Sequence, residues 1–244
     1  MNTFKLPRMQ IALLHPGEMG AAVAASLSGP VWWVPEGRSE ATAERAGHAG
    51  MKPIDDPRAA DVILSVCPPD NALEVARSVA GFTGLYVDAN AISPMTSRDV
   101  AAALPEATFV DGGIIGPPPR SAGTTRLYLS GAEAATVAAL FADTIVDTRI
   151  VADASAMKMV YASWTKGSQA LLLSARATAR ELGVETELLD EWEDLGLNPE
   201  GAERARRTKG WRWVGEMEQI ADTFAAAGQP DGFHRAAADV FRQS

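Results

Sequence analysis

The sequence predicts an α/β protein with a mostly parallel sheet in its first part and a smaller all-helical second part. Short apolar bursts alternate with helix-length segments up to Asp153, and only helical patterns follow. Such alternation is typical of strand–helix–strand crossovers that build a parallel sheet. A glycine-containing turn directly after the first burst adds the pattern of a phosphate-binding strand–turn–helix unit.

The pattern of elements changes along the chain and predicts a domain boundary. A long helix is expected from 156 to 182, because its period is helical and Gly183 follows it as a helix stop. The boundary near residue 154 predicts two domains, a dinucleotide-binding domain at 1–154 and a helical dimerisation and substrate domain at 155–244. The expected strands are apolar runs at 10–14, 31–34, 62–66, 85–88, 108–115, 126–130 and 144–151.

Composition limits the partners. The 244 residues are 47% hydrophobic and 22% charged, which is ordinary for a globular chain with a buried core. The net charge of -9 argues against a nucleic-acid or anionic-membrane partner, because both attract positive surfaces. Cys67 is the only cysteine, so no internal disulfide can form. Residues 1–8 lack the apolar core of a secretory signal. No apolar run approaches the length of about 20 residues that a membrane-spanning helix requires. We expect a cytoplasmic protein.

The turn after the first burst resembles the G-x-G-x-x-G fingerprint of dinucleotide-binding domains. His15 stands at the first glycine position, while Gly17 and Gly20 occupy the other two. Pro16 removes one N–H donor from the loop. The motif by itself fits either a Rossmann-type dinucleotide site or an ordinary strand-to-helix turn.

A second cofactor signal follows the next apolar burst. Arg38 and Ser39 stand where a dinucleotide fold selects between ribose hydroxyls and a 2′-phosphate, and both residue types suit a phosphate. Glu36 is the competing feature, because an acidic residue there would bind the ribose hydroxyls of NAD. NADP is therefore preferred and NAD is the alternative.

Four motifs in this order resemble the β-hydroxyacid dehydrogenase superfamily, which includes 3-hydroxyisobutyrate and 6-phosphogluconate dehydrogenases. They are EGRS at 36–39, DANAISP at 88–94, DGGIIGP at 111–117 and DASAMK at 153–158. The resemblance extends through 165–167 and 211–234 to a poorly characterised phosphogluconate-dehydrogenase-like, NADP-binding branch. It implies a Rossmann-type domain, a helical domain and a homodimer formed through the C-terminal helices.

The resemblance also implies residue roles. Lys158 falls on the catalytic lysine, whose ammonium would stabilise negative charge on a reacting oxygen and donate the proton. The implied activity is NADP-dependent hydride transfer between nicotinamide and a small carbonyl, hydroxy-acid or imine substrate. The residues expected at the cofactor are His15, Pro16, Gly17, Glu18, Met19, Gly20, Arg38, Ser39, Cys67, Pro68 and Asn90.

Substrate contacts are expected along one face of the long helix. Ala162 and Thr165 follow Lys158 at helical spacing with Tyr161 beside them, although the same face suits an interdomain seam. His234 either contacts substrate from a partner subunit or is a satisfied histidine in the last helix. The remaining residues expected at the substrate lie on one predicted strand and are Gly113, Ile114 and Ile115.

Departures from the family pattern bear on the substrate. Ala162 stands where the family has an asparagine, and 115–117 stand where it has a Ser-Gly-Gly run that binds a substrate carboxylate, here called the carboxylate clamp. A less polar carbonyl or an imine is therefore the expected substrate, unless Arg120 and Arg149 replace this clamp. These losses also leave open a non-catalytic nucleotide-binding sensor or scaffold. The three histidines lack metal-ligand spacing, so no metal is expected. An apolar stripe from Trp211 to Phe224 predicts a helix in the core or at a dimer interface.

Overall fold

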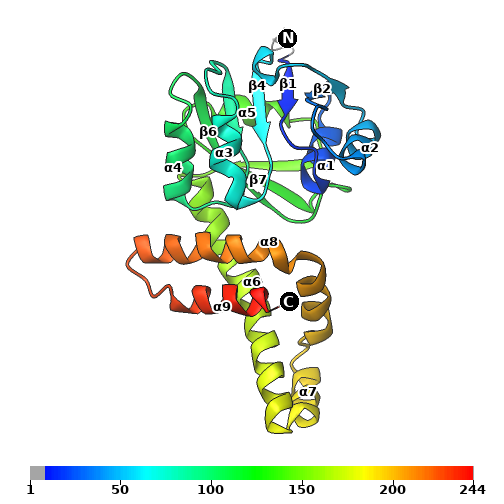
Figure 1. The fold of residues 1–244 in the computed structure, drawn as a ribbon, viewed down its shortest axis with the longest axis vertical. Coiled ribbons are helices and arrows are strands. Elements are labelled where there is room, and N and C mark those ends of the chain that lie inside the picture. The colour runs from blue at the N-terminus through cyan, green and yellow to red at the C-terminus, as the bar shows by residue number, and fades with distance from the viewer. Residues whose placement is uncertain (1–8, 244) are drawn as a thin grey trace, which may run out of the picture. The chain divides into compact units, whose positions relative to one another are not determined.

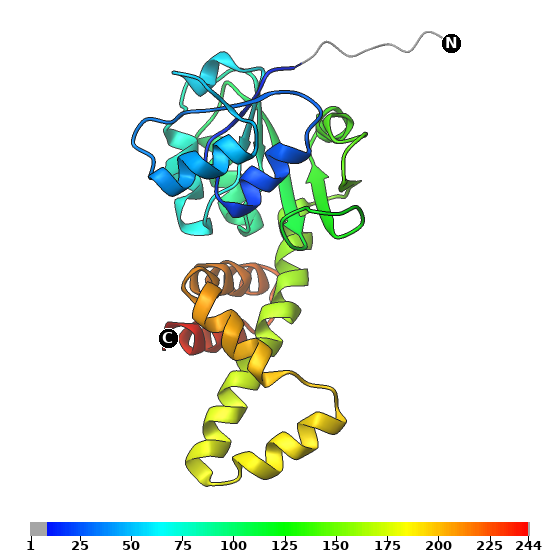
Figure 2. The same cartoon turned by 90° about the vertical axis from the view of Figure 1, so that its right-hand side faces the viewer.

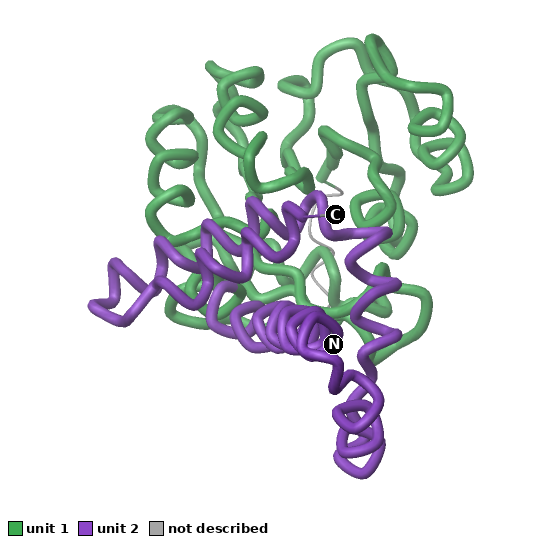
Figure 3. Tube along the Cα trace, turned by 60° about the horizontal axis from the view of Figure 1, so that its bottom comes forward, with its two compact units in different colours: residues 1–158 green, residues 159–244 purple. Residues whose placement is uncertain are grey.

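The computed structural model describes residues 9–243. The N-terminal stretch 1–8, on which the expectation about a secretory signal rests, lies outside the described residues. The chain divides into two compact units, Met1–Lys158 and Met159–Ser244 (Figure 3). The domain boundary expected near residue 154 stays a prediction.

The first unit contains an eight-stranded sheet in the order β3-β2-β1-β4-β5-β6-β7-β8 (Figure 1). Neighbouring strands are parallel except β6 and β7, which are antiparallel. The predicted α/β fold class is confirmed, and every expected strand is present. The strands are β1 (Ile11–Leu13), β2 (Val31–Trp33), β3 (Lys52–Pro53), β4 (Val62–Ser65), β5 (Leu85–Asp88), β6 (Thr108–Ile115), β7 (Thr125–Ser130) and β8 (Val146–Ile150).

Helices cover both faces of this sheet, because successive side chains of a strand point to opposite sides (Figure 2). Leu13 and Val87 pack in one core cluster with α1, α2 and α5. Ala12 and Tyr86, their neighbours in sequence, pack in a second cluster with α3 and α4. These helices are α1 (Glu18–Ser26), α2 (Glu40–His48), α3 (Ala72–Arg77), α4 (Pro94–Ala102) and α5 (Ala134–Leu140).

The strand order reverses at β1. This strand pairs with β2 on one side and with β4 on the other, in parallel registers. In open α/β sheets, ligands bind outside the carboxyl ends of the strands at such a switch point, because the connections leave it in opposite directions. The loops that follow β1 and β4 therefore mark the expected binding edge.

The described part of the second unit, 159–243, contains helices and no strand, and α6 begins in the first unit and continues into the second (Figure 1). The long helix predicted from 156 begins at Ala154 and ends at Leu182, before Gly183 with a φ of 74°. No helix of the described residues is both long and apolar enough to span a bilayer. The helices are α6 (Ala154–Leu182), α7 (Glu185–Asp194), α8 (Pro199–Ala226) and α9 (Gly232–Arg242).

The predicted apolar stripe lies on α8 and is only partly buried. Met217 and Ile220 are fully buried, whereas Trp211 is 68% exposed. Trp213 takes the buried aromatic position and packs edge-on against Phe241 of α9. Met217 and Ile220 fit the core alternative of this prediction, whereas Trp211 lies on a different, exposed face of the helix, and its place at a dimer interface stays a prediction.

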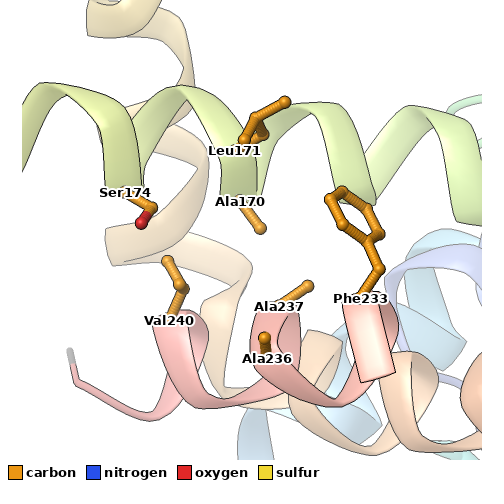
Figure 4. Close-up of a pocket in the computed structure, with 7 residues that line it drawn as sticks. All are labelled: Ala170, Leu171, Ser174, Phe233, Ala236, Ala237 and Val240. Carbon is orange, nitrogen blue, oxygen red and sulfur yellow. The ribbon is translucent and has the colours of Figure 1, made fainter. Parts of the chain in front are cut away.

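A small apolar pocket lies between α6 and α9 within the second unit (Figure 4). The Phe233 ring reaches toward α6 beside Gly167, where an added Cβ would lie 3.0 Å from the ring. The glycine at this position thus makes room for the aromatic ring. The pocket is lined by Ala170, Leu171, Ser174, Phe233, Ala236, Ala237 and Val240.

Candidate functional site

The turn after β1 has the geometry of a phosphate cradle. Gly17 is the N-cap residue of α1 and no side chain caps the helix, so the first-turn N–H groups have no capping acceptor from a side chain. A Cβ at Gly20 would lie 2.7 Å from the His15 carbonyl oxygen. Gly20 is therefore required for the close approach of helix and strand that the sequence motif predicted.

His15 occupies the position of the missing first glycine. Its carbonyl accepts a hydrogen bond from the Gly17 N–H at 2.8 Å, which tightens the turn. Its Nδ1 atom is buried and has no hydrogen-bond partner among the described residues. Burial first, and the nearby Arg38 charge second, lower the pKa of His15 to about 4, so the imidazole is neutral at physiological pH.

Two arginines hold this turn from the segment after β2. Arg38 donates to the Leu14 carbonyl at 3.4 Å, and Arg45 donates through Nε to the Pro16 carbonyl at 3.1 Å. Neither guanidinium is paired with a carboxylate within residues 9–243. The sequence pattern identified Arg38 but missed Arg45, because its bond to Pro16 joins residues that are 29 positions apart in the chain.

Ser39 begins the helix that carries Arg45. Its hydroxyl accepts a hydrogen bond from the Thr42 N–H at 3.3 Å and lies 3.0 Å from the Thr42 hydroxyl. Thr42 in turn accepts from Arg45 Nη2 at 3.0 Å. The capping residue and the arginine are thus joined in one polar network at the start of α2, and Glu36 is exposed.

Asn90 ties the ends of β4 and β5 together. Its Oδ1 accepts from the Cys67 N–H at 2.6 Å, and its Nδ2 donates to Ser65 Oγ at 3.1 Å and to Asp88 Oδ2 at 2.9 Å. These contacts fix the loop that contains Cys67 and Pro68 at the switch point. Direct contact of these residues with a nicotinamide ribose stays a prediction.

Burial controls the ionisable groups beside Asn90. It raises the pKa of the Asp88 carboxyl to about 7, against the opposing hydrogen bonds from Asn90. It also raises the pKa of the Cys67 thiol to about 12, with a smaller contribution from the Asp88 charge. Cys67 is therefore a protonated thiol at neutral pH and not a nucleophile.

Lys158 lies above strand β6 in the first unit. A Cβ built on Gly113 would lie 2.8 Å from the Lys158 Cβ and 2.9 Å from the Ala154 carbonyl oxygen. A Cβ built on Gly112, one residue earlier, would lie 2.8 Å from the Asp88 carbonyl oxygen. Because these two residues have no Cβ, the first turns of α6 pack closely against Gly113 and the end of β5 packs closely against Gly112. The half-buried Lys158 therefore lies near the carboxyl end of β5.

The other residues expected at the substrate lie in different surroundings. Ile114 is buried in the hydrophobic core and Ile115 is buried on the same strand. Ala162 is buried, and the Thr165 hydroxyl donates to carbonyls of its own helix. Ala162, Thr165 and the exposed Tyr161 belong to the second unit, so a site that joins them to Lys158 stays a prediction.

His234 packs between aromatic rings in the second unit. Its ring lies edge-on to Phe224 at 4.3 Å and to Phe233 at 5.3 Å between centroids. Burial lowers the pKa of His234, and its Nδ1 has no hydrogen-bond partner among the described residues. The alternative that all hydrogen-bonding groups of His234 have partners does not hold for this nitrogen. Contact of His234 with substrate stays a prediction.

Arg149, one of the two arginines considered as a replacement for the carboxylate clamp, forms an ion pair within its own strand. Its guanidinium pairs with Asp147 on the same strand, with Nη2 at 2.9 Å from Oδ2. Arg120 is exposed in the segment between β6 and β7. Of the two arginines proposed for this role, Arg149 is already engaged because Asp147 lies two residues before it.

Comparison with known proteins relates the chain to proteins of unassigned function. It is 34% identical over 167 residues to an uncharacterized 28.5 kDa protein of Methanothermus fervidus, and the match covers 65% of each chain, just under two thirds. A family model described as a domain of unknown function, DUF1932, matches residues 179–244.

Solved structures give the fold class. A conserved protein of unknown function, reported as structurally similar to 3-hydroxyacid dehydrogenases, is 28% identical with a TM-score of 0.70 and 96% coverage of both chains. The 3-hydroxyisobutyrate dehydrogenase of Mycobacterium tuberculosis is 20% identical with a TM-score of 0.68, covering 96% of this chain and 93% of that chain. A reductive aminase of Aspergillus terreus, solved with NADPH, is 18% identical with a TM-score of 0.58, covering 97% and 93%.

The sheet has the strand order of dinucleotide-binding α/β folds, and a C-terminal helical region follows it. The chain has the fold of the 3-hydroxyacid dehydrogenases, and its four sequence motifs resemble the same group of proteins. The resemblance drawn from the sequence is therefore confirmed at the level of the fold.

Proposed function

We propose that the chain is an NADP-dependent oxidoreductase that transfers a hydride between nicotinamide and a small carbonyl, hydroxy-acid or imine substrate, with Lys158 as general acid/base. The observation that carries the proposal is the contact of Lys158 with Gly113 on the strand beside β5. This contact supports a role for Lys158 at the carboxyl edge of the sheet, where helix α1 begins without a side-chain cap.

The residues after β1 and β2 fit a phosphorylated dinucleotide. The first-turn N–H groups of α1 suit a pyrophosphate, because they lack a side-chain cap and lie at the positive end of the helix dipole. Arg38 and Arg45 provide two cations without a carboxylate partner in the described chain, in a protein with a net charge of -9. This local positive charge favours the 2′-phosphate of NADP over the ribose hydroxyls of NAD, for which Glu36 is the competing residue.

The reaction assigns a clear task to Lys158. Nicotinamide, when bound, supplies or accepts the hydride. The Lys158 ammonium stabilises the charge that develops on the reacting oxygen or nitrogen and donates a proton to it, and in the reverse direction the neutral amine accepts that proton. His15 adds no competing positive charge, since its lowered pKa keeps it neutral.

The substrate is a less polar carbonyl or an imine in this proposal. The segment that aligns with the carboxylate grip contains Ile115, which is buried, and Pro117, which has no N–H. The Pro117 carbonyl is held by the Thr125 hydroxyl at 2.6 Å. A carboxylate would meet few donors there, because it needs several N–H or O–H groups to replace water.

A homodimer through the C-terminal helices forms part of the same proposal. Several large apolar side chains of the second unit are exposed in the single chain, and Trp164, Leu182 and Trp211 are exposed by 76%, 71% and 68%. Association would bury this apolar surface. Sedimentation velocity with NADPH present is expected to give a dimer, and a monomer at micromolar concentrations would overturn this part of the proposal.

The test combines cofactor binding with turnover. NADPH affinity is measured by fluorescence titration, and NADPH oxidation is followed by absorbance with a panel of aldehydes, ketones, cyclic imines and hydroxy acids. Lys158→Ala is expected to lower kcat by about 10²–10⁴-fold and to leave NADPH affinity within a few-fold of wild type. Lys209→Ala, at an exposed lysine of α8, is the matched control and should keep wild-type turnover.

The second candidate is a nucleotide-binding sensor or scaffold without turnover. The observations that favour it are the altered residues His15, Ala162 and Pro117. It predicts tight NADPH binding with no oxidation of NADPH by any member of the panel. Turnover that survives in Lys158→Ala at the wild-type rate would reject the catalytic proposal, and failure to bind NADPH would reject both candidates.

A further inference from the structure

Asp111 collects hydrogen bonds from three different elements. Its Oδ1 accepts from Ser97 Oγ of α4 at 2.9 Å and from Ser155 Oγ of α6 at 2.5 Å. Its Oδ2 accepts from Ser130 Oγ of β7 at 3.1 Å and from the Ser155 N–H at 2.7 Å. A half-buried carboxylate on β6 thus binds one helix, one strand and the backbone at the start of α6.

The start of α6 is fixed by further bonds of the same kind. Ser130 Oγ donates to Asp111 and also accepts from the Ala154 N–H at 2.9 Å, and Asp153 Oδ1 accepts from the Ala156 N–H at 2.7 Å. Three successive N–H groups of the first turn therefore have acceptors that belong to the first unit. Carboxylates at this position are also favoured by the helix dipole.

Lys158 lies three residues after Ser155, about one helical turn further along. Asp111 and Gly113 are two residues apart on β6, so both face the same side of the sheet. The first holds the beginning of α6 and the second contacts the Lys158 Cβ. We propose that Asp111 and Ser155 form a positioning clamp that sets the place of the Lys158 amine relative to the cofactor, an inference that rests on the proposed function.

The clamp requires a carboxylate. All four groups that meet Asp111 donate hydrogen bonds to it, and an ionised carboxylate only accepts. An amide at this position has one accepting oxygen, and its two N–H groups would face donors. Asp111→Asn therefore leaves donors unpaired, whereas Ser155→Ala removes one hydroxyl and retains the backbone bond to Asp111. Ser155→Thr keeps the hydroxyl.

The first test observes Lys158 directly. Lysines are reductively methylated with ¹³C, the Lys158 resonance is assigned by its absence in Lys158→Arg, and NADPH is added. In wild type the resonance is expected to shift on addition of NADPH. In Ser155→Ala and Asp111→Asn the shift should fall by at least about half while NADPH affinity stays within about three-fold of wild type, because the phosphate cradle is untouched. Ser155→Thr should retain the wild-type shift.

Turnover gives the second measurement, with the substrate that the panel identifies. Ser155→Ala is expected to lower kcat by about 10–10²-fold at nearly unchanged KM for NADPH, since misplacement by about 1 Å has effects of this size. Ser163→Ala is the matched control, because its hydroxyl donates only to the Val160 carbonyl of its own helix. It should leave the resonance and kcat unchanged.

The outcomes separate the inference from the proposed function. If saturating NADPH does not shift the Lys158 resonance of the wild type, the lysine is remote from the cofactor. That result would overturn both the proposed function and the clamp. A normal wild-type response that Ser155→Ala also shows, at full kcat, would overturn the clamp alone. If Asp111→Asn fails to fold by circular dichroism, Ser155→Ala and Ser155→Thr decide the result.

Discussion

Replacing Gly20 by alanine tests whether the turn after β1 is built for a cofactor. The added Cβ would lie 2.7 Å from the His15 carbonyl oxygen and 3.2 Å from the nearer Leu13 methyl. Ordinary contact distances are about 3.5 Å or more, so the start of α1 must move by about 0.8 Å relative to the backbone of the turn. The carbonyl cannot rotate away as a flexible side chain would, because it accepts the Gly17 N–H.

Two free-energy effects follow from this movement. Overpacking of a close helix–strand contact costs about 1–3 kcal/mol of unfolding free energy. The shift also turns the first-turn N–H groups away from a bound phosphate, and each lost bond to a charged group costs about 1.5–3 kcal/mol. Loss of one such bond corresponds to a rise of about 10–100-fold in the Kd for NADPH.

The assay pairs NADPH fluorescence titration with urea unfolding. Gly47→Ala is the matched control, because a Cβ at Gly47 meets nothing within 4 Å and the residue lies inside helix α2. This control should bind NADPH like wild type and gain up to about 1 kcal/mol of stability. Wild-type NADPH affinity together with an unchanged urea midpoint in Gly20→Ala would refute the assignment of the turn.

Two further predictions concern buried charges. Lys166 Nζ lies 2.9 Å from Glu216 Oε1, and their side chains are only 14% and 10% exposed. Lys166→Met is therefore expected to lower the free energy of unfolding in urea by about 3–5 kcal/mol, because it leaves a buried carboxylate unpaired. The double variant Lys166→Met with Glu216→Leu should recover most of this stability, and an equal loss in the single and the double variant would contradict this account. The pKa of Asp88, raised by burial to about 7 from 3.8, means that the folded state binds the proton more tightly. The unfolding free energy should thus fall as pH rises from about 4 to about 7 and level off above pH 7. Asp88→Asn should flatten this pH dependence in urea titrations at pH 5, 6 and 8. An equal pH dependence in wild type and Asp88→Asn would contradict the prediction.

The fold could be predicted from the sequence because buried parallel strands are continuous apolar runs between turn residues. The runs at 85–88 and 108–115 coincide with β5 and β6. Strand β3 was missed, since its two residues, Lys52 and Pro53, are exposed and provide no apolar pattern. Helix α6 begins two residues before its predicted start, because acceptors on other elements satisfy its first N–H groups.

The site was only partly visible in the sequence for a similar reason. Spacing identifies Gly20 and Arg38, because a strand–turn–helix unit has a fixed local geometry. Spacing does not identify Arg45, whose bond to the Pro16 carbonyl joins residues 29 positions apart. The bonds that converge on Asp111 come from positions 97, 130 and 155, and only the folded chain brings them together.

The unusual loop residues acquire a physical explanation from these contacts. His15 and Pro16 replace a glycine and an N–H donor of the usual turn, which by itself weakens a phosphate site. In the structure, Arg38 and Arg45 donate to the carbonyls on either side of His15, at Leu14 and Pro16. These bonds offset the negative ends of two backbone dipoles and add two positive charges beside the turn. The altered fingerprint is therefore compatible with an anionic cofactor, because cations from the next crossover replace what the loop has lost.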